Sequence, residues 1–347
     1  MTADGAADPV GEDEAAGLLA PLSAFPAVVL AVSGGPDSLA LMHLTARWVR
    51  ATPHAPRLSV ATVDHALRAE SAAEAAAVGL AASSLGLPHA VLVWTGPKPA
   101  TGVQRAAREA RYALLAAHAH TTGAGAIVTG HQADDQAETV LMRLLAGSGP
   151  AGLAGMRPAR PLGGLLLLRP LLGLPKARLV ATVAAAGLVP VDDPGNASLR
   201  FARGRLRRLM PMLAAEGLDR DRLLRLAQRA ARAEAGLVAA ADDAFGRLVR
   251  QQEDGVVLAP GFAALPEEIA VRLLLRACGA AQAGTVKGRA GPTRLMRAER
   301  LTAALQAAHH DRQALVRTFA GCRVAGDCHG LVTITAERPR RRGRRQG

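Results

Sequence analysis

A short stretch near the N-terminus constrains the fold of this chain more than any other. Residues 27–32 form an unbroken apolar run, AVVLAV, of the length and composition typical of a strand buried on both faces. A turn, SGGPDS, follows at residues 33–38, and helically spaced apolar residues come next. Adjacent glycines let backbone N–H groups approach an anion, and the positive end of the following helix points at the same place. The stretch therefore predicts a strand, a phosphate-binding turn and a helix.

The turn matches neither GxxxxGK[ST] nor GxGxxG. An ordinary strand-to-helix turn is the alternative, since short glycine turns are common in α/β domains. However, Ser33 and Ser38 add hydroxyl donors, and the Asp37 carboxylate suits a Mg²⁺ ion on the phosphates. This combination resembles the pyrophosphate loop of the N-type ATP pyrophosphatases, which split ATP between its α and β phosphates.

Strand-like and helix-like segments alternate after this turn. Strands are predicted at 58–63, 89–94, 126–129 and 165–168, and helices at 70–85, 102–120, 134–145 and 176–186. This alternation predicts an α/β fold, a Rossmann-like parallel sheet with helices on both faces. Ligands of such sheets bind beyond the carboxyl ends of the strands. SGGPDS, Asp64-His65 and Gly130-His131 all fall at such ends, so we expect them in one crevice.

The composition changes along the chain and suggests its division. We expect a disordered acidic lead-in at residues 1–24, ending in a short helix, and a catalytic domain at 25–213. Residues 214–337 predict a smaller, mainly helical second domain that contacts nucleic acid, with strands near 314–319 and 331–335. A basic tail, 338–347, ends the chain.

The charge of the chain favours a nucleic-acid partner. The formal net charge is +13 over 347 residues, more than an enzyme of small acidic metabolites needs. The alternative is an ordinary solvated surface on which arginine replaces lysine. The sequence also predicts a cytoplasmic protein without a membrane partner. Its three cysteines include no CxxC pair, it has no apolar run of membrane-spanning length, and its N-terminus is acidic, unlike a signal peptide.

A second informative stretch is GHQADDQAET at residues 130–139. Asp134, Asp135 and Glu138 lie three and four residues apart, so their carboxylates cluster within one helical turn. Negative charge at a helix N-terminus can simply stabilise the helix dipole. Beside a phosphate site it also suits Mg²⁺ or the amine of a cationic substrate. His131 fits either a phosphate contact or a satisfied strand-end histidine.

The motifs resemble one family when they are taken in order. This family is the tRNA(Ile)-lysidine synthetases. The resemblance is carried by SGGPDS, DHALRAES at 64–71, AREARY at 107–112, GHQADDQAET, RPLL at 169–172 and the arginine-rich segment 192–213. The resemblance covers residues 27–213 well and the rest loosely, and the extra C-terminal domain of longer members is missing. Gly204 stands where the family usually has an asparagine between two arginines, which puts a contact by that side chain in doubt.

The resemblance implies a ligase that forms a carbon–nitrogen bond in two steps. The C2 oxygen of the wobble cytidine, in the isoleucine tRNA with anticodon CAU, attacks the α-phosphorus of ATP and releases pyrophosphate. The ε-amine of free lysine then displaces AMP. ATP, Mg²⁺, lysine and tRNA are thus the implied ligands, and whether the chain forms a homodimer stays open.

The implied roles fall on residues that match the motifs. The catalytic set is Asp37, Arg111, Asp135 and Glu138, with Arg108 as a further candidate on the leaving pyrophosphate. Binding of ATP and pyrophosphate falls to Ser33, Gly34, Gly35, Pro36, Asp37, Ser38, Asp64, His65, Gly130 and His131. The candidates for binding lysine are Asp37, Asp135 and Glu138, and the candidates for binding the metal are Asp37 and Asp134. The candidates for binding tRNA phosphates are Arg200, Arg203, Arg205, Arg207 and Arg208.

Three other functions compete with this one. A tRNA thiolase of the same superfamily needs cysteines near the nucleotide site, whereas the three here lie at positions 278, 322 and 328. NAD and GMP synthetases share the loop, but the arginine cluster and high charge do not fit small-molecule amidation. A non-catalytic ATP- and RNA-binding module is the alternative of another class, and it would not need the intact acid turn.

Overall fold

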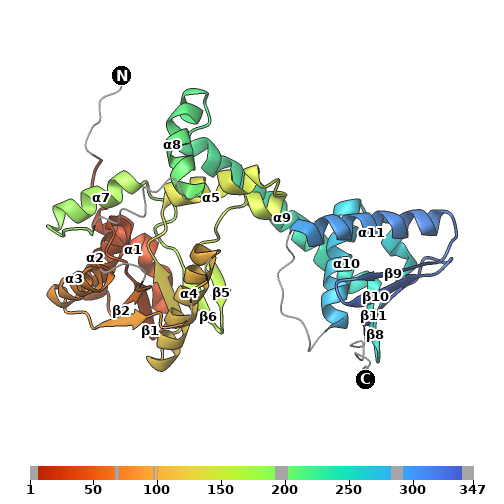
Figure 1. Ribbon diagram of the computed structural model, residues 1–347, viewed down its shortest axis with the longest axis horizontal. Coiled ribbons are helices and arrows are strands. Elements are labelled where there is room, and N and C mark those ends of the chain that lie inside the picture. The colour runs from red at the N-terminus through yellow and green to blue at the C-terminus, as the bar shows by residue number, and fades with distance from the viewer. Residues whose placement is uncertain are drawn as a thin grey trace, which may run out of the picture. The chain divides into compact units, whose positions relative to one another are not determined.

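A six-stranded sheet forms the core of the N-terminal part of the computed structural model (Figure 1). The structure describes residues 7–66, 70–96, 98–99, 101–191, 202–282 and 292–337. The sheet has the order β3-β2-β1-β4-β6-β5, and only β5 runs antiparallel to its neighbour. Its strands are β1 (Ala27–Ala31), β2 (Arg57–Asp64), β3 (His89–Val93), β4 (Ala126–Thr129), β5 (Ala159–Leu162) and β6 (Leu165–Leu168). The predicted parallel α/β sheet is confirmed, and β5 is a strand that was not predicted.

Helices cover both faces of this sheet because side chains of a strand alternate between its faces. On one face, Val28 and Leu30 pack with α2 and α7 in one cluster of buried residues. On the other face, Val29 and Ile127 pack with α4. The apolar run is thus buried on both sides, as predicted. The helices of this part are α2 (Pro36–Ala51), α3 (Ser71–Ser84), α4 (Val103–Thr121), α5 (Ala133–Leu145), α6 (Pro150–Leu153) and α7 (Lys176–Ala185).

The N-terminal segment corrects the expectation of a disordered lead-in. Helix α1 (Glu12–Leu19) and the 3₁₀ helix η1 (Ala20–Ala24) pack on the sheet domain, with Leu19 and Leu22 fully buried. Two of its acidic residues, Glu12 and Glu14, form ion pairs with Arg47 and Arg178. The acidic composition suggested disorder, but burial of the leucines and pairing of the acids offset the entropy cost of ordering.

Two further helices continue the first part of the chain. Leu206 of α8 (Ala202–Ala215) and Leu223 and Ala227 of α9 (Arg220–Leu248) pack against Val140 and Leu141 of α5. Contacts divide the chain into two units, residues 1–228 and 229–347, so the division falls inside α9 rather than near residue 214, where we expected it.

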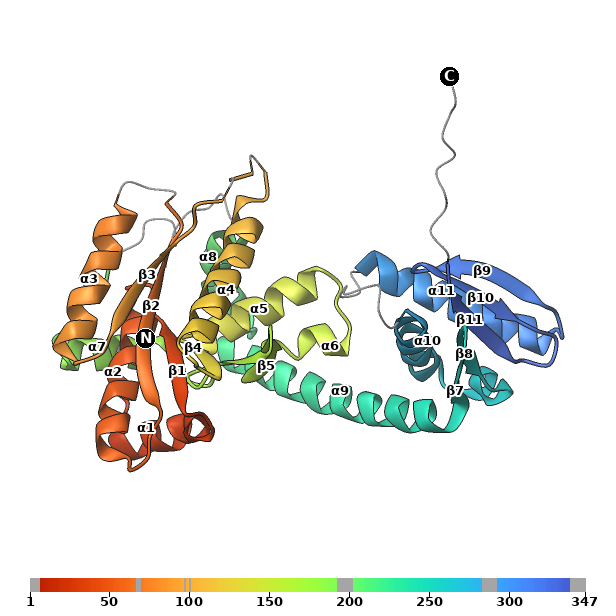
Figure 2. The same cartoon turned by 90° about the horizontal axis from the view of Figure 1, so that it is seen from below.

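The second unit contains an antiparallel sheet of order β7-β8-β11-β10-β9. Helices α10 (Glu267–Ala281) and α11 (Pro292–His310) lie beside this sheet and share its hydrophobic core (Figure 2). The strands are β7 (Val249–Gln252), β8 (Gly255–Leu258), β9 (Leu315–Phe319), β10 (Cys322–Gly326) and β11 (Val332–Ala336), and the 3₁₀ helix η3 spans Pro260–Ala264. β9 and β11 match the two predicted strands. Among the described residues, no helix is long and apolar enough to cross a membrane.

Candidate active site

The turn after β1 is held in a fixed shape by its own hydrogen bonds. The Ser33 N–H donates to Ser38 Oγ at 3.1 Å, and the Ser38 hydroxyl donates to the Gly35 carbonyl at 2.9 Å. Gly34 has a φ of +88°, and a Cβ atom there would lie 2.9 Å from Val191 Cγ2. Its carbonyl accepts the Val191 N–H at 2.9 Å. A side chain at position 34 is therefore excluded by both conformation and space.

Gly130 brings the end of β4 against the first turn of α2. A Cβ atom at this position would lie 2.7 Å from the Asp37 carbonyl oxygen and 3.1 Å from the Ser38 nitrogen. These neighbours are backbone atoms of a helix and have little freedom to move. The close approach places His131, the next residue, beside the SGGPDS turn.

A pocket of about 260 Å³ opens at the carboxyl ends of β1 and β4. Its apolar wall comes from strand residues such as Val32 and Val63 and from Leu115 of α4. Its polar wall combines residues of several elements: Ser33, Gly35, Pro36, Asp37, Ser38, Arg111, Tyr112, Thr129, Gly130, His131, Asp135, Lys176, Arg203 and Arg207. The turn and Gly130-His131 meet in this pocket, as expected, whereas Asp64-His65, which were expected in the same crevice, do not line it.

Asp37 is the carboxylate nearest the turn, and its environment is unusual. Burial is the main cause that raises the pKa of Asp37 from 3.8 to about 6. The charges of Asp135 and Asp134 contribute to the rise, whereas the charge of Lys176 and the Gln132 side chain oppose it. Its Oδ1 atom is buried without a hydrogen-bond partner in the described part of the protein. A buried oxygen without a partner costs free energy, which a bound cation or donor recovers.

Lys176 was missed by the sequence reasoning. It lies far from the turn in the chain, at the start of α7, and reaches the pocket because α7 packs beside α2. Helix α7 is positioned in turn by the backbone N–H of Lys176, which donates to Asp134 Oδ2 at 2.9 Å. No motif marks such a lysine, since only the packing of α7 brings it to the site.

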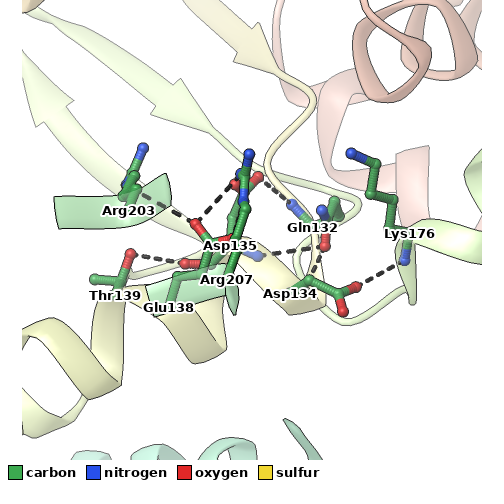
Figure 3. Close-up of polar contacts among 8 residues, drawn as sticks. All are labelled: Gln132, Asp134, Asp135, Glu138, Thr139, Lys176, Arg203 and Arg207. Atoms are coloured by element: carbon green, nitrogen blue, oxygen red, sulfur yellow. Dashed lines mark hydrogen bonds and ion pairs between the residues drawn. The ribbon is translucent and has the colours of Figure 1, made fainter. Parts of the chain in front are cut away.

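The acid turn begins α5 with a reciprocal cap (Figure 3). The Gln132 side chain accepts the N–H groups of Asp134 and Asp135, and Asp135 Oδ2 accepts the Gln132 N–H at 3.3 Å. Asp135 lines the pocket. Asp134 turns instead toward α7 and lies 3.9 Å from the guanidinium of Arg220. The two neighbouring acids therefore have different surroundings.

Glu138 faces arginines of α8 rather than the pocket. Its carboxylate is buried, accepts Arg207 Nε and Nη2, the latter at 3.4 Å, and lies 3.9 Å from Arg203 Nε (Figure 3). These contacts hold Arg203 and Arg207 at the pocket. Gly204 between them is buried, while Arg205 and Arg208 are exposed on the same helix. Arg200 lies outside the described residues.

Asp64 and His65 lie beside the pocket without lining it. Asp64 Oδ1 accepts the Ala66 N–H at 2.7 Å, and a hydrogen bond with Ser71 is the main cause that lowers the pKa of Asp64. His65 packs edge-on against Trp94, with ring centroids 6.1 Å apart. Its Nε2 lies 3.3 Å from Arg111 Nη2, so His65 contacts the site through Arg111.

His131 is surrounded by positive charge. Its Nδ1 lies 2.8 Å from Thr129 Oγ1, which in turn donates to the Leu168 carbonyl at 3.4 Å. Burial, followed by the charges of Arg169, Arg108, Arg203 and Arg111, lowers the pKa of His131 to about 3. His131 is therefore neutral at physiological pH, and it can donate or accept a hydrogen bond but cannot serve as a cation.

Comparisons with known proteins agree on the family. Residues 10–213 match the model of the PP-loop domain. The tRNA(Ile)-lysidine synthase of Methylobacterium nodulans is 55% identical over 91% of this chain and 92% of its own length. The relatives of the same name from Methylobacterium sp. (strain 4-46) and Rhodopseudomonas palustris are 53% and 51% identical, over 99% and 96% of this chain and 99% and 97% of their own.

A solved structure supports the fold. A U34-tRNA thiolase, NcsA from Methanococcus maripaludis with its [4Fe-4S] cluster, has a TM-score of 0.50 over 58% of this chain and 71% of its own at 18% identity. At that identity the likeness concerns the fold alone. The matched domain and the relatives that span nearly the whole chain together show that this chain belongs to the tRNA(Ile)-lysidine synthase family of PP-loop proteins.

Proposed function

We propose that this protein converts the wobble cytidine of the CAU-anticodon isoleucine tRNA to lysidine, using ATP and free lysine. In the first step, the cytidine C2 oxygen bonds to the α-phosphorus of ATP and pyrophosphate leaves. In the second step, the lysine ε-amine bonds to C2, AMP leaves and the amine loses a proton. The pocket combines a phosphate-binding turn, acids and arginines, which are the groups that these steps need.

One observation carries the proposal furthest. Asp37 Oδ1 is buried beside the turn, has no hydrogen-bond partner in the part of the chain that the structure describes, and lies within the electrostatic reach of Lys176. A purely structural carboxylate in this position would be expected to have a donor for each buried oxygen. The arrangement instead favours a ligand that completes the site, as the phosphates of ATP with their cation would.

Mg²⁺ fits this carboxylate. Mg²⁺ in nucleotide sites is commonly held by one or two protein carboxylates together with phosphate oxygens and water, so a larger acidic cage is not needed. Among the described residues there is no group of three or more His, Cys, Asp or Glu side chains for a metal. We assign Asp37 to the metal ahead of Asp134, because Asp134 caps α7. Bound there, Mg²⁺ supplies charge neutralisation on the phosphates.

The lysine substrate needs an anionic contact for its ammonium group. Asp37 and Asp135 both line the pocket, whereas the carboxylate of Glu138 is engaged by Arg203 and Arg207. We therefore assign the amine to Asp135, with Asp37 as second acid, and assign Glu138 to positioning the two arginines. Asp135 is also the candidate for accepting the proton that the amine loses.

Arginines provide the remaining charge. Arg111 lines the pocket and is held beside His65, so it suits the developing charge of pyrophosphate. Arg203, Arg205, Arg207 and Arg208 of α8 suit tRNA phosphates. The thiolase alternative has less support, because Cys278, Cys322 and Cys328 all belong to the second unit rather than to the unit that forms the pocket.

The two steps can be separated experimentally. Purified protein, ATP, Mg²⁺ and the CAU-anticodon isoleucine tRNA should release pyrophosphate without lysine, since adenylation comes first. Lysine should then increase turnover and release AMP. Asp37→Ala should abolish pyrophosphate release while the circular-dichroism spectrum stays native. Pyrophosphate release that does not depend on RNA, or Asp37→Ala activity within twofold of wild type, would contradict the proposal.

A further inference from the structure

Tyr112 lies at the centre of an arginine cluster that the proposed chemistry does not use. The guanidinium of Arg108, from the same helix α4, lies 5.1 Å from the Tyr112 ring centroid, and that of Arg160, from β5, lies 5.0 Å from it. Arg169, which follows β6, is near enough to Tyr112 for the tyrosine to influence the pKa of its guanidinium. We name this set, Arg108, Tyr112, Arg160 and Arg169, the tyrosine–arginine cluster.

The cluster carries positive charge without acidic partners. Within the described part of the chain, none of its arginines forms an ion pair with a carboxylate. Arginines elsewhere show the contrast: Arg178 pairs with Glu14, and Arg272 with Glu234. Like charges held together in this way repel one another, and a bound polyanion removes that cost.

The surroundings of Arg169 independently favour an anionic ligand. It is only 3% exposed, and its Nε atom is buried without a hydrogen-bond partner among the described residues. One of its terminal nitrogens donates to the Arg157 carbonyl at 2.7 Å. Burial lowers the pKa of Arg169, although not enough to neutralise a guanidinium. A buried cation with an unsatisfied donor is destabilising unless a ligand or a neighbour compensates for it.

The position of the cluster in the sheet separates it from the phosphate-binding turn. The turn follows β1, whereas Arg169 follows β6 and Arg160 lies on the edge strand β5, on the far side of β4. Adjacent strands lie roughly 4.8 Å apart, so β6 is about 10 Å from β1 across the sheet. Of the cluster, only Tyr112 lines the pocket. The arginines therefore extend from the pocket toward the edge of the sheet.

We propose that the tyrosine–arginine cluster binds the phosphate backbone of the substrate RNA next to the nucleotide that enters the pocket. This inference rests on the proposed function. A linear polyanion that runs from the pocket to the edge of the sheet fits the spread of the guanidiniums over α4, β5 and the end of β6. The phosphates of ATP fit it less well, because the turn that cradles them follows β1. The cluster thus adds a second RNA contact to the arginines of α8.

The test uses the full-length protein and an RNA stem-loop with the CAU anticodon. Binding is measured over a range of salt concentrations for wild type, Arg160→Ala and Arg108→Ala. Arg57→Ala is the matched control, because it removes the same charge from the exposed amino end of β2, away from the pocket. Each cluster variant should reduce the slope of log affinity against log salt by roughly 0.7, the value for one single-strand phosphate contact. For Arg160→Ala, the Km for ATP should stay within twofold of wild type; Arg108→Ala is judged by RNA binding alone, because Arg108 is also a candidate for the leaving pyrophosphate.

Two variants from different elements guard against local misfolding, since Arg108 is on a helix and Arg160 on a strand. Salt slopes equal to that of Arg57→Ala would overturn the inference. So would a rise in the ATP Km of Arg160→Ala of fivefold or more with unchanged RNA binding, since the cluster would then serve ATP. If the wild-type protein does not bind the stem-loop or release pyrophosphate, the proposed function fails and this inference with it. Wild-type binding with unchanged variants refutes the inference alone.

Discussion

The buried Glu138 carboxylate contacts the partly exposed guanidinium of Arg207 and joins α5 to α8. Because Arg203 also lies near this carboxylate, one acid holds two arginines at the pocket. Glu138 thereby connects the acid turn to the arginine-rich helix. In the structure, Glu138 therefore positions two positively charged side chains.

Glu138→Gln should therefore weaken both stability and RNA binding. The substitution keeps the shape but removes the charge from a buried carboxylate, and we expect a loss of about 1 to 3 kcal/mol in unfolding free energy, less than for a fully buried pair because the arginines are partly exposed. Urea unfolding measures this loss. Glu109→Gln, at the exposed Arg105–Glu109 pair, is the control and should change stability by less than about 0.5 kcal/mol. Equal losses of unfolding free energy in both variants would show that the Glu138 contact stabilises the protein no more than an exposed ion pair does.

Asp37→Asn should stabilise the protein at neutral pH while abolishing activity. The folded pKa of about 6 lies above the ordinary 3.8, so ionisation of Asp37 costs folding free energy. This cost is absent below the unfolded pKa, grows between the two values and is complete above pH 6. Asn removes it, and we expect a gain of about 1 to 2 kcal/mol at pH 7.5, reduced from the full shift because the side chain keeps some solvent contact.

Urea unfolding of Asp37→Asn and wild type across this pH range measures the gain. The difference should shrink steadily as the pH falls toward 4. Asp13→Asn, an exposed acid of α1, makes the same change in net charge and should show no such trend. A variant less stable than wild type at pH 7.5 would mean that the ionised carboxylate is stabilised in the fold, contrary to this account.

His131 should not titrate in the physiological range. Its pKa of about 3 lies below the ordinary 6.5, so protonation is disfavoured in the folded state, and this residue favours unfolding as the pH falls through 6.5. In NMR spectra of protein with labelled histidine, the His131 ring signals, assigned with His131→Gln, should stay fixed between about pH 5.5 and 8. The same ring should titrate normally in urea. A midpoint above 5.5 in the folded protein would show that the arginines do not act on His131 as described.

Gly130→Ala should disrupt the junction between β4 and α2. The added methyl group meets helix backbone rather than flexible side chains, so we expect a loss of about 1 to 3 kcal/mol and displacement of the phosphate-binding turn. Gly173→Ala is the matched control, because its Cβ atom meets nothing within 4 Å. Thermal unfolding and the Km for ATP report the two effects. Similar values for both variants would argue against a tight junction.

Local patterns predicted the architecture well because they act over short distances. The apolar run of β1, the glycine turn and the alternation of elements were enough for a parallel sheet and for the meeting of SGGPDS with Gly130-His131 at one edge. Strands β5, β7, β8 and β10, of four or five residues each, were not predicted, since short runs often carry little periodicity. The order of the strands depends on packing rather than on any motif.

The sequence predicted which residues belong to the candidate site better than it predicted which way their side chains point. Spacing placed Asp134, Asp135 and Glu138 in one turn, but only the packing of α7 and α8 decides which acid faces the pocket. Lys176 was missed for the same reason, as it is brought in from a distant helix. The buried Arg169 appeared only as part of a motif, and its unsatisfied Nε is visible only in three dimensions.

The most direct test of the central claim is incorporation of labelled lysine into RNA. Full-length protein, ATP and Mg²⁺ should attach one lysine to each CAU-anticodon isoleucine tRNA, with one AMP and one pyrophosphate released for each, and Asp37→Ala should attach none. Absence of lysine from the RNA, or transfer of labelled sulfur in its place, would contradict the account.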